Sequence, residues 1–138
     1  MNMRQRSCRF TAERLCLLVE ALLHLAAARL ALALLPYRLY ERLLGPARSP
    51  NRNVPVALAK AIGSAVRRVA ELAPWRADCL LQATAAQWML RRRKAAARLH
   101  IGVEAETEPL LAHAWLTYES CVLTGRRGSR RFHTIRIY

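Results

Sequence analysis

The chain has 138 residues, of which 54% are hydrophobic and 23% are charged. This balance supplies enough apolar side chains for one core, and it excludes both a wholly disordered chain and a protein of several large domains. Lysine and arginine number 23 against 9 acids, and the resulting net charge of +14 suits a polyanion, an anionic membrane surface or an acidic peptide. A GC-rich coding sequence with no selected partner would give the same arginine-rich composition.

The cysteines are irregularly spaced, and no cleavable secretion signal precedes them. They are Cys8, Cys16, Cys79 and Cys121. We therefore expect reduced thiols rather than a disulfide framework, and a cytoplasmic protein. One thiol is then available as a nucleophile, while the others serve as small buried side chains.

The first predicted element is a Leu- and Ala-rich helix with Thr11 as its N-cap. Pro36 is expected to end it and to leave a second, short helix over 37–44. Residues 15–35 are nearly long enough to span a membrane, but three ionisable side chains inside this run are costly in hydrocarbon, namely Glu20, His24 and Arg29. A soluble amphipathic helix is therefore favoured over a membrane span, and contact with a membrane surface or a partner stays an alternative.

A stretch rich in Gly, Pro and Asn over 45–55 predicts an irregular connection. We place a boundary there, between an N-terminal helical portion (1–50) and a core (51–138). Residues 56–72 then return to helical spacing, with apolar side chains on one side and charged ones largely elsewhere.

The next predicted helix begins near Ala77 or Asp78 and runs to Arg93. It puts Cys79 in the first turn, where the positive end of the helix dipole favours the thiolate. A small buried cysteine with no chemical role is the alternative. The basic run 91–94 lies at the far end, where it is expected to cap the carbonyl end of the helix rather than to bind nucleic acid.

From residue 97 the pattern alternates, which predicts strands over 98–103, 112–118, 121–124 and 132–138. With tight turns at 119–120 and 125–129, this part of the chain is expected to form an antiparallel meander.

His113 lies on the second of these strands between the small residues Ala112 and Ala114, so its imidazole should be reachable. A cysteine on a helix followed by a histidine on a strand is typical of a thiol–imidazole pair. The alternative is a histidine satisfied within the core.

Four blocks of sequence, 74–80, 91–93, 99–103 and 111–115, resemble the transglutaminase-like leader peptidases of lasso-peptide biosynthesis. The resemblance implies an α+β fold with a papain-like core, in which the helix that carries the nucleophile packs on a small antiparallel sheet behind an N-terminal helical portion. It implies Cys79 as nucleophile, His113 as base, and packing roles for Trp75 and Trp115.

The same resemblance implies removal of the leader peptide from a ribosomally made precursor, before macrolactam formation. The implied partners are the precursor peptide, a leader-recognition protein and an ATP-dependent cyclase. A threonine before the cleavage site would be typical of the family.

The sequence departs from this family at the third catalytic residue. An Asp is usual shortly after the hairpin that follows the His strand, and here the chain reads Thr124-Gly125-Arg126. Glu119, Thr124 and a backbone carbonyl are the alternatives, although Glu119 lies about 20 Å from His113 along a straight strand. A catalytically weak or inactive scaffold that holds the precursor is therefore the main rival function, and a basic module that binds nucleic acid or a membrane surface is the next.

No cofactor is expected. The residues that could bind zinc follow no closed zinc pattern; they are Cys79, His100, His113, Cys121 and His133. The chain also lacks a glycine-rich phosphate loop and a recognisable nucleic-acid motif, so we expect neither ATP nor nucleic acid as a direct ligand.

Overall fold

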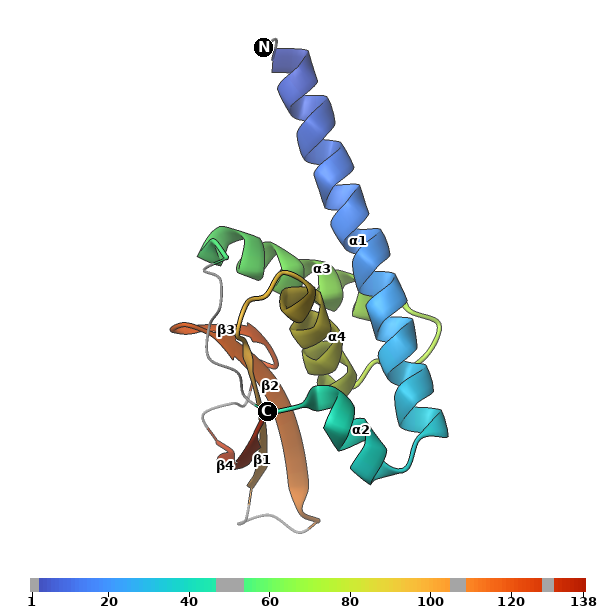
Figure 1. The fold of residues 1–138 in the computed structure, drawn as a ribbon, viewed down its shortest axis with the longest axis vertical. Coiled ribbons are helices and arrows are strands. Elements are labelled where there is room, and N and C mark those ends of the chain that lie inside the picture. Colours follow the sequence, from blue (N-terminus) through green and yellow to red (C-terminus); the bar gives the residue numbers. More distant parts are fainter. Residues whose placement is uncertain (1–2, 47–53, 105–108, 128–130) are drawn as a thin grey trace.

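The computed structural model describes residues 3–46, 54–104, 109–127 and 131–138, and in these residues four helices precede four strands (Figure 1). The helices are α1 (Met3–Leu34), α2 (Tyr37–Leu44), α3 (Val56–Leu72) and α4 (Cys79–Arg92). The strands are β1 (Arg98–Glu104), β2 (Leu111–Tyr118), β3 (Cys121–Thr124) and β4 (His133–Ile137). This arrangement of helices beside a small antiparallel sheet confirms the predicted α+β fold.

The break after α1 is confirmed, because α1 ends at Leu34 and α2 begins at Tyr37, directly after Pro36. The predicted start at Thr11 was wrong, since α1 already begins at Met3. Residues 3–10 contain neither Gly nor Pro, so nothing in them stops a helix that has started to form. As a result α1 projects well past the rest of the chain at its N-terminal end (Figure 1).

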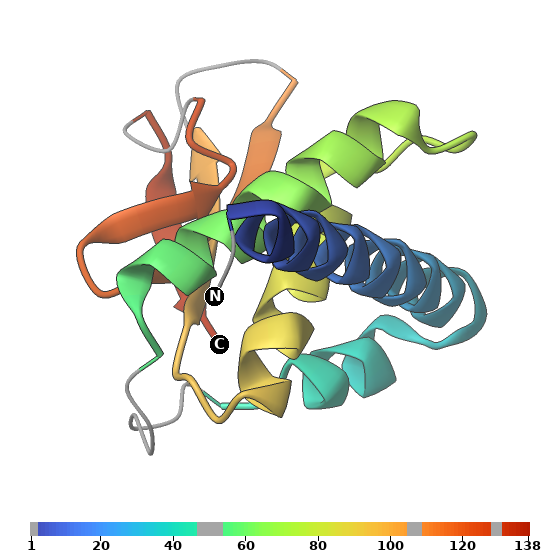
Figure 2. The same ribbon diagram turned by 90° about the horizontal axis from the view of Figure 1, so that it is seen from above.

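Helix α1 lies across α3 and α4 (Figure 2) and packs on both. Ala21, Leu25 and Ala28 are fully buried in this contact, whereas Leu23 and Leu30 on the other side are 64% and 59% exposed. By length and composition alone, Thr11–Leu34 could cross a membrane, a test that core helices of soluble proteins and N-terminal signal sequences also pass. Only 17% of the most apolar 18-residue window in this stretch is buried, so α1 presents a largely uncovered apolar side.

The basic end of α4 is tied to the first two helices. Arg93 donates two hydrogen bonds to the Glu20 carboxylate of α1, at 2.7 and 2.8 Å, and Arg91 donates to the Leu43 carbonyl of α2 at 3.0 Å. The hydrogen bond from Arg93 lowers the pKa of Glu20, and the same contact raises the pKa of Arg93. These arginines therefore hold the helices together in addition to complementing the end of α4.

All the strand pairs are antiparallel, and the strand order is β3-β2-β1-β4. The predicted meander is correct for β1, β2 and β3 but wrong for β4, which pairs with the other edge of β1. The segment between β3 and β4 is longer than a tight hairpin needs, so its length does not require β4 to pair with β3. Tyr138 continues this pairing through two backbone hydrogen bonds to Leu99, at 2.8 and 2.9 Å.

The hydrophobic core lies between the helices and one face of the sheet, and α1, α4 and β2 contribute to the same cluster of buried side chains. Tyr118 fixes the start of α3 to the sheet, because its hydroxyl donates to the Val54 carbonyl at 2.9 Å and accepts from the Val54 N–H at 3.0 Å. The proposed boundary at residue 50 lies outside the described residues, and the division of the chain at that point stays a prediction.

Candidate active site

Cys79 is the first residue of α4, which confirms its predicted place in the first turn of this helix. Helix α3 ends before Pro74, and the chain approaches α4 with Asp78 as an extended N-cap residue. Gln82 holds this approach, because its side-chain amide donates to the Ala77 carbonyl at 2.8 Å and its backbone N–H donates to the Asp78 carbonyl at 3.1 Å. The Asp78 side chain makes no capping hydrogen bond, so it does not cover the first N–H groups of α4.

The thiol of Cys79 lies against strand β2. The backbone N–H of Ala114 points to the Cys79 sulfur, with the nitrogen 3.4 Å from Sγ. Cys79 is half-buried, and both Cys79 and His113 line the same cavity. The fold therefore brings the helix-borne cysteine to the residue next to the strand-borne histidine.

The imidazole of His113 is oriented by a backbone group. Its Nε2 lies 2.7 Å from the Gly125 carbonyl oxygen, which can only accept a hydrogen bond. The Nε2 atom must therefore carry the proton, and Nδ1 is left with the lone pair that a base requires. The ring also contacts two aromatic side chains, with its centroid 5.9 Å from that of Trp115 and 5.0 Å from that of Phe132.

Gly125 is required at this position on two grounds. Its φ is +71°, a conformation that residues with a side chain adopt at a cost. A Cβ there would also lie 2.5 Å from the Ala114 carbonyl oxygen and 2.8 Å from the Trp115 Cβ. Both neighbours belong to β2 next to His113, so only glycine lets the turn after β3 reach the imidazole.

Of the three alternatives for the orienting group, the backbone carbonyl is the one that contacts His113. Thr124 is fully buried, and its hydroxyl has no hydrogen-bond partner in the described part of the chain. Glu119 is exposed at the turn between β2 and β3, where it adopts a φ of +52°. The catalytic roles of Cys79 and His113 stay a prediction that rests on this geometry.

A row of stacked rings continues from His113 along the sheet. Trp115 also stacks on His100, with centroids 5.3 Å apart and planes inclined by 3°, and a Cβ on Gly102 would lie 2.9 Å from the Trp115 ring. His100 Nε2 lies 2.8 Å from the Thr117 hydroxyl oxygen. Burial lowers the pKa of His100, and the nearby positive charge of Arg98 lowers it further.

The packing role predicted for Trp115 therefore has direct support in these ring contacts. Trp75 is half-buried, and its indole nitrogen has no hydrogen-bond partner among the residues that the structure describes. The contact between Phe132 and His113 was not predicted, because it depends on where β4 pairs.

A cavity of about 940 Å³ opens beside Cys79 and His113. Polar side chains from α3 form one wall, and the end of β3 with the turn after it forms the other. The lining residues are Lys60, Ser64, Arg67, Glu71, Cys79, Gln82, His113, Val122, Leu123, Gly125, Arg126 and Arg127. The α3 residues were not predicted to belong to the site, although their recurrence on one side of a helix was a signal for it.

Within the described residues, no three His, Cys, Asp or Glu side chains converge as a metal site would require. The described cysteines Cys16, Cys79 and Cys121 are free thiols. The arrangement at Cys79 thus offers a thiol, an imidazole with a defined tautomer and the N–H groups at a helix start. These groups suit acyl transfer from an amide.

Comparison with protein families gives a match over most of the chain. The family model described as the transglutaminase-like superfamily matches residues 21–136, which is most of the chain. No curated protein and no solved structure matches this sequence.

Proposed function

Because the chain belongs to the transglutaminase-like superfamily, which includes cysteine peptidases, we propose that it is a cysteine peptidase with Cys79 as nucleophile and His113 as base. We propose further that its substrate is a lasso-peptide precursor, from which it removes the leader peptide. The observation that carries the catalytic assignment is the meeting of the first residue of α4 with β2 at Ala114, next to a histidine oriented by Gly125.

In this mechanism the Cys79 thiol gives its proton to Nδ1 of His113, and the thiolate attacks the scissile carbonyl carbon. The N–H groups at the start of α4 stabilise the oxyanion that forms. His113 then returns the proton to the leaving amine, which leaves a thioester on Cys79. Water, activated by the same imidazole, hydrolyses the thioester and restores the thiol.

The partners in this proposal are a leader-recognition protein and an ATP-dependent cyclase, and the compartment is the cytoplasm. Free thiols at Cys16, Cys79 and Cys121 fit a reducing compartment. The uncovered apolar side of α1 supports contact with another macromolecule, because large exposed apolar patches mark interaction sites.

A second candidate function is a scaffold that binds the precursor with little or no cleavage. The observation in its favour is the neutral partner of His113, because a carbonyl stabilises an imidazolium less than a carboxylate does.

Mass spectrometry of the precursor, incubated with the recognition protein and each variant of this chain, distinguishes the two. Cys79→Ala and His113→Ala should abolish cleavage, whereas Cys121→Ala, which removes a free thiol outside the cavity, should keep it. An intact precursor that binds the wild type as tightly as it binds Cys79→Ala would instead favour the scaffold. Cleavage that survives in Cys79→Ala would overturn the peptidase assignment.

A further inference from the structure

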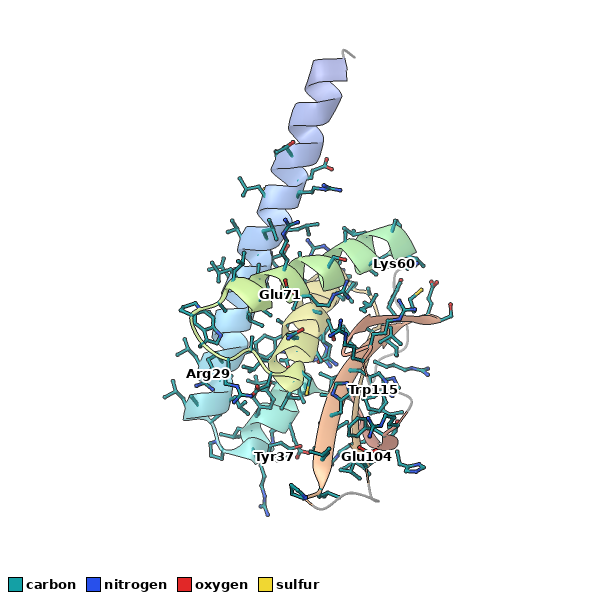
Figure 3. The ribbon with its side chains drawn as sticks, turned by 180° about the vertical axis from the view of Figure 1, so that it is seen from behind. Arg29, Tyr37, Lys60, Glu71, Glu104 and Trp115 are labelled. Carbon is teal, nitrogen blue, oxygen red and sulfur yellow. The ribbon has the colours of Figure 1, made fainter. Side chains whose placement is uncertain are left out.

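One side of α3 forms a polar wall beside the candidate nucleophile. Lys60, Ser64, Arg67 and Glu71 recur at the spacing of one helical face, all are exposed, and all line the cavity that contains Cys79. Lys60 and Glu71 lie well apart along this helix (Figure 3), about 16 Å by helical rise. The wall is therefore cationic over most of its length and acidic only at the end of α3.

The opposite wall adds further positive charge. The turn after β3 contributes Arg126 and Arg127 to the cavity, and no acid of that wall lines it among the described residues. Neither Lys60 nor Arg127 forms an ion pair within the described part of the chain. Their charges therefore remain available to a ligand.

Arg67 joins the two walls and is held in place. Its guanidinium donates to the Leu123 carbonyl of β3 and, at 3.1 Å, to the Ser64 hydroxyl. The backbones are close at this point, because a Cβ on Gly63 would lie 2.7 Å from the same carbonyl oxygen. A guanidinium has five N–H donors, so one that is fixed in this way is preorganised to bind an anionic group with its remaining donors.

We propose that this cavity binds an acidic segment of a peptide, with side-chain carboxylates near Lys60, Arg67 and Arg127. The described lining contains no Phe, Tyr or Trp on which nucleic-acid bases could stack, and Val122 and Leu123 offer apolar contacts to a peptide instead. Glu71 repels acids at its own end, which restricts the preference to the part of the cavity near Lys60. Cleavage of a peptide bound in this way rests on the proposed function, whereas the preference for binding acidic peptides does not.

The binding test uses the full chain carrying Cys79→Ala, so that no probe is consumed. The probes are two eight-residue peptides with the same neutral dye, identical except that one carries three glutamates and the other three glutamines. Fluorescence anisotropy should give about tenfold tighter binding of the glutamate peptide, from charge pairs that contribute about two- to fivefold each. The difference should shrink when salt is raised from about 0.05 to 0.5 M.

The high net charge of the chain requires a matched control. Lys60→Gln and Arg127→Gln should each lower affinity for the glutamate peptide by about two- to fivefold. Arg68→Gln makes the same change of charge on an exposed residue of α3 that does not line the cavity, and it should have a smaller effect. Equal affinity for the two peptides, or an equal loss with Arg68→Gln, would overturn the proposal.

Binding of a double-stranded oligonucleotide of random sequence is measured in the same anisotropy assay. If it binds more tightly than the glutamate peptide and with the same dependence on Lys60, the ligand is a nucleic acid and the peptide proposal fails. If its binding does not depend on Lys60, the assignment of the cavity to a peptide is supported.

A cleavage arm separates this proposal from the peptidase assignment. Wild type is incubated with the precursor and with versions in which each Asp or Glu near the cleavage site is changed to Asn or Gln. Slower cleavage of a neutralised version supports both ideas, and equal rates throughout overturn only the acidic preference. If no version is cleaved, the peptidase assignment fails, and the anisotropy data still decide the preference.

Discussion

The Nε2 atom of His113 lies 2.7 Å from the carbonyl oxygen of Gly125, so a backbone group holds the imidazole where the family resemblance leads one to expect an aspartate. A carbonyl fixes the tautomer as a carboxylate would, but it adds no negative charge beside the imidazolium. Since a thiol–imidazole ion pair depends less on such a charge than a serine nucleophile does, the arrangement is compatible with a working peptidase.

Replacement of Gly125 by Ala should impair cleavage by disturbing this contact. The added Cβ would meet the Ala114 carbonyl oxygen at 2.5 Å, so the turn must move away from His113. We expect kcat/KM for the precursor to fall about tenfold or more. Nitrogen NMR of the His113 ring should show a protonated Nε2 in the wild type and a mixture of tautomers in the variant.

Gly45→Ala is the control for this change. Gly45 also has a positive φ, of +63°, but its Cβ would meet only the end of the flexible Arg91 side chain, with the nearest atom at 3.0 Å. Both variants should lose about 1 kcal/mol of unfolding free energy through the backbone, and only Gly125→Ala should lose activity. A fully active Gly125→Ala protein would show that the carbonyl does not orient the base.

The contact between Glu20 and Arg93 should make stability depend on pH. The hydrogen bond from Arg93 lowers the pKa of Glu20 below its usual 4.5, so this stabilisation is fully present above that value and is lost as the pH falls through the folded-state pKa. Glu20→Gln should lower the unfolding free energy by about 1 kcal/mol at pH 7. In urea titrations the difference from wild type should narrow below about pH 4.5; a difference that is constant with pH would rule out this origin.

Truncation of two leucines on α1 should have very different effects on stability. Leu25 is fully buried against the other helices, and Leu25→Ala should cost about 2 to 5 kcal/mol of unfolding free energy. Leu23 is 64% exposed on the same helix, and Leu23→Ala should stay within about 0.5 kcal/mol of wild type. Comparable losses in both variants would mean that the exposed side of α1 is covered in solution.

His100 should make the protein less stable in mild acid. Burial lowers the pKa of its imidazole, so just below pH 6.5 the unfolded chain binds more protons at this residue than the folded chain does. The unfolding free energy therefore decreases as the pH is lowered through that range, by at most about 1.4 kcal/mol per pH unit. His100→Gln removes this titration, and denaturant curves at several pH values should show a flatter dependence between about pH 7 and 5.

Much of the fold could be predicted because local signals were strong. Pro36 and Pro55 mark helix starts that the structure confirms, and the residues before Cys79 already placed it in a first turn. The early start of α1 was not predicted. Thr11 was the predicted N-cap, but a single threonine does not stop a helix when the residues before it also tolerate one. The pairing of β4 with β1 was not predicted, because strand order depends on which edge of the sheet is unpaired. Alternation along a single strand does not reveal that.

The candidate site was predictable only in part, for a similar reason. Cys79 and His113 carry recognisable chemistry at recognisable positions on a helix and a strand. The carbonyl of Gly125 carries none in the sequence, because every residue has such a group. In the sequence Lys60 and Arg67 look like ordinary solvent-facing charges. The structure packs α3 near β3, where Arg67 donates to the Leu123 carbonyl and both cations line the same cavity.

The stacking of Trp115 on both His100 and His113 gives the protein a built-in optical probe. Indole emission is quenched by a charged imidazole in contact with it, so the fluorescence of Trp115 should report protonation events on either side of its ring. In a chain where the other indoles are replaced by phenylalanine through Trp75→Phe and Trp88→Phe, that signal would come from Trp115 alone and would need no substrate. The environment of the two stacked imidazoles could then be followed even before the natural peptide is in hand.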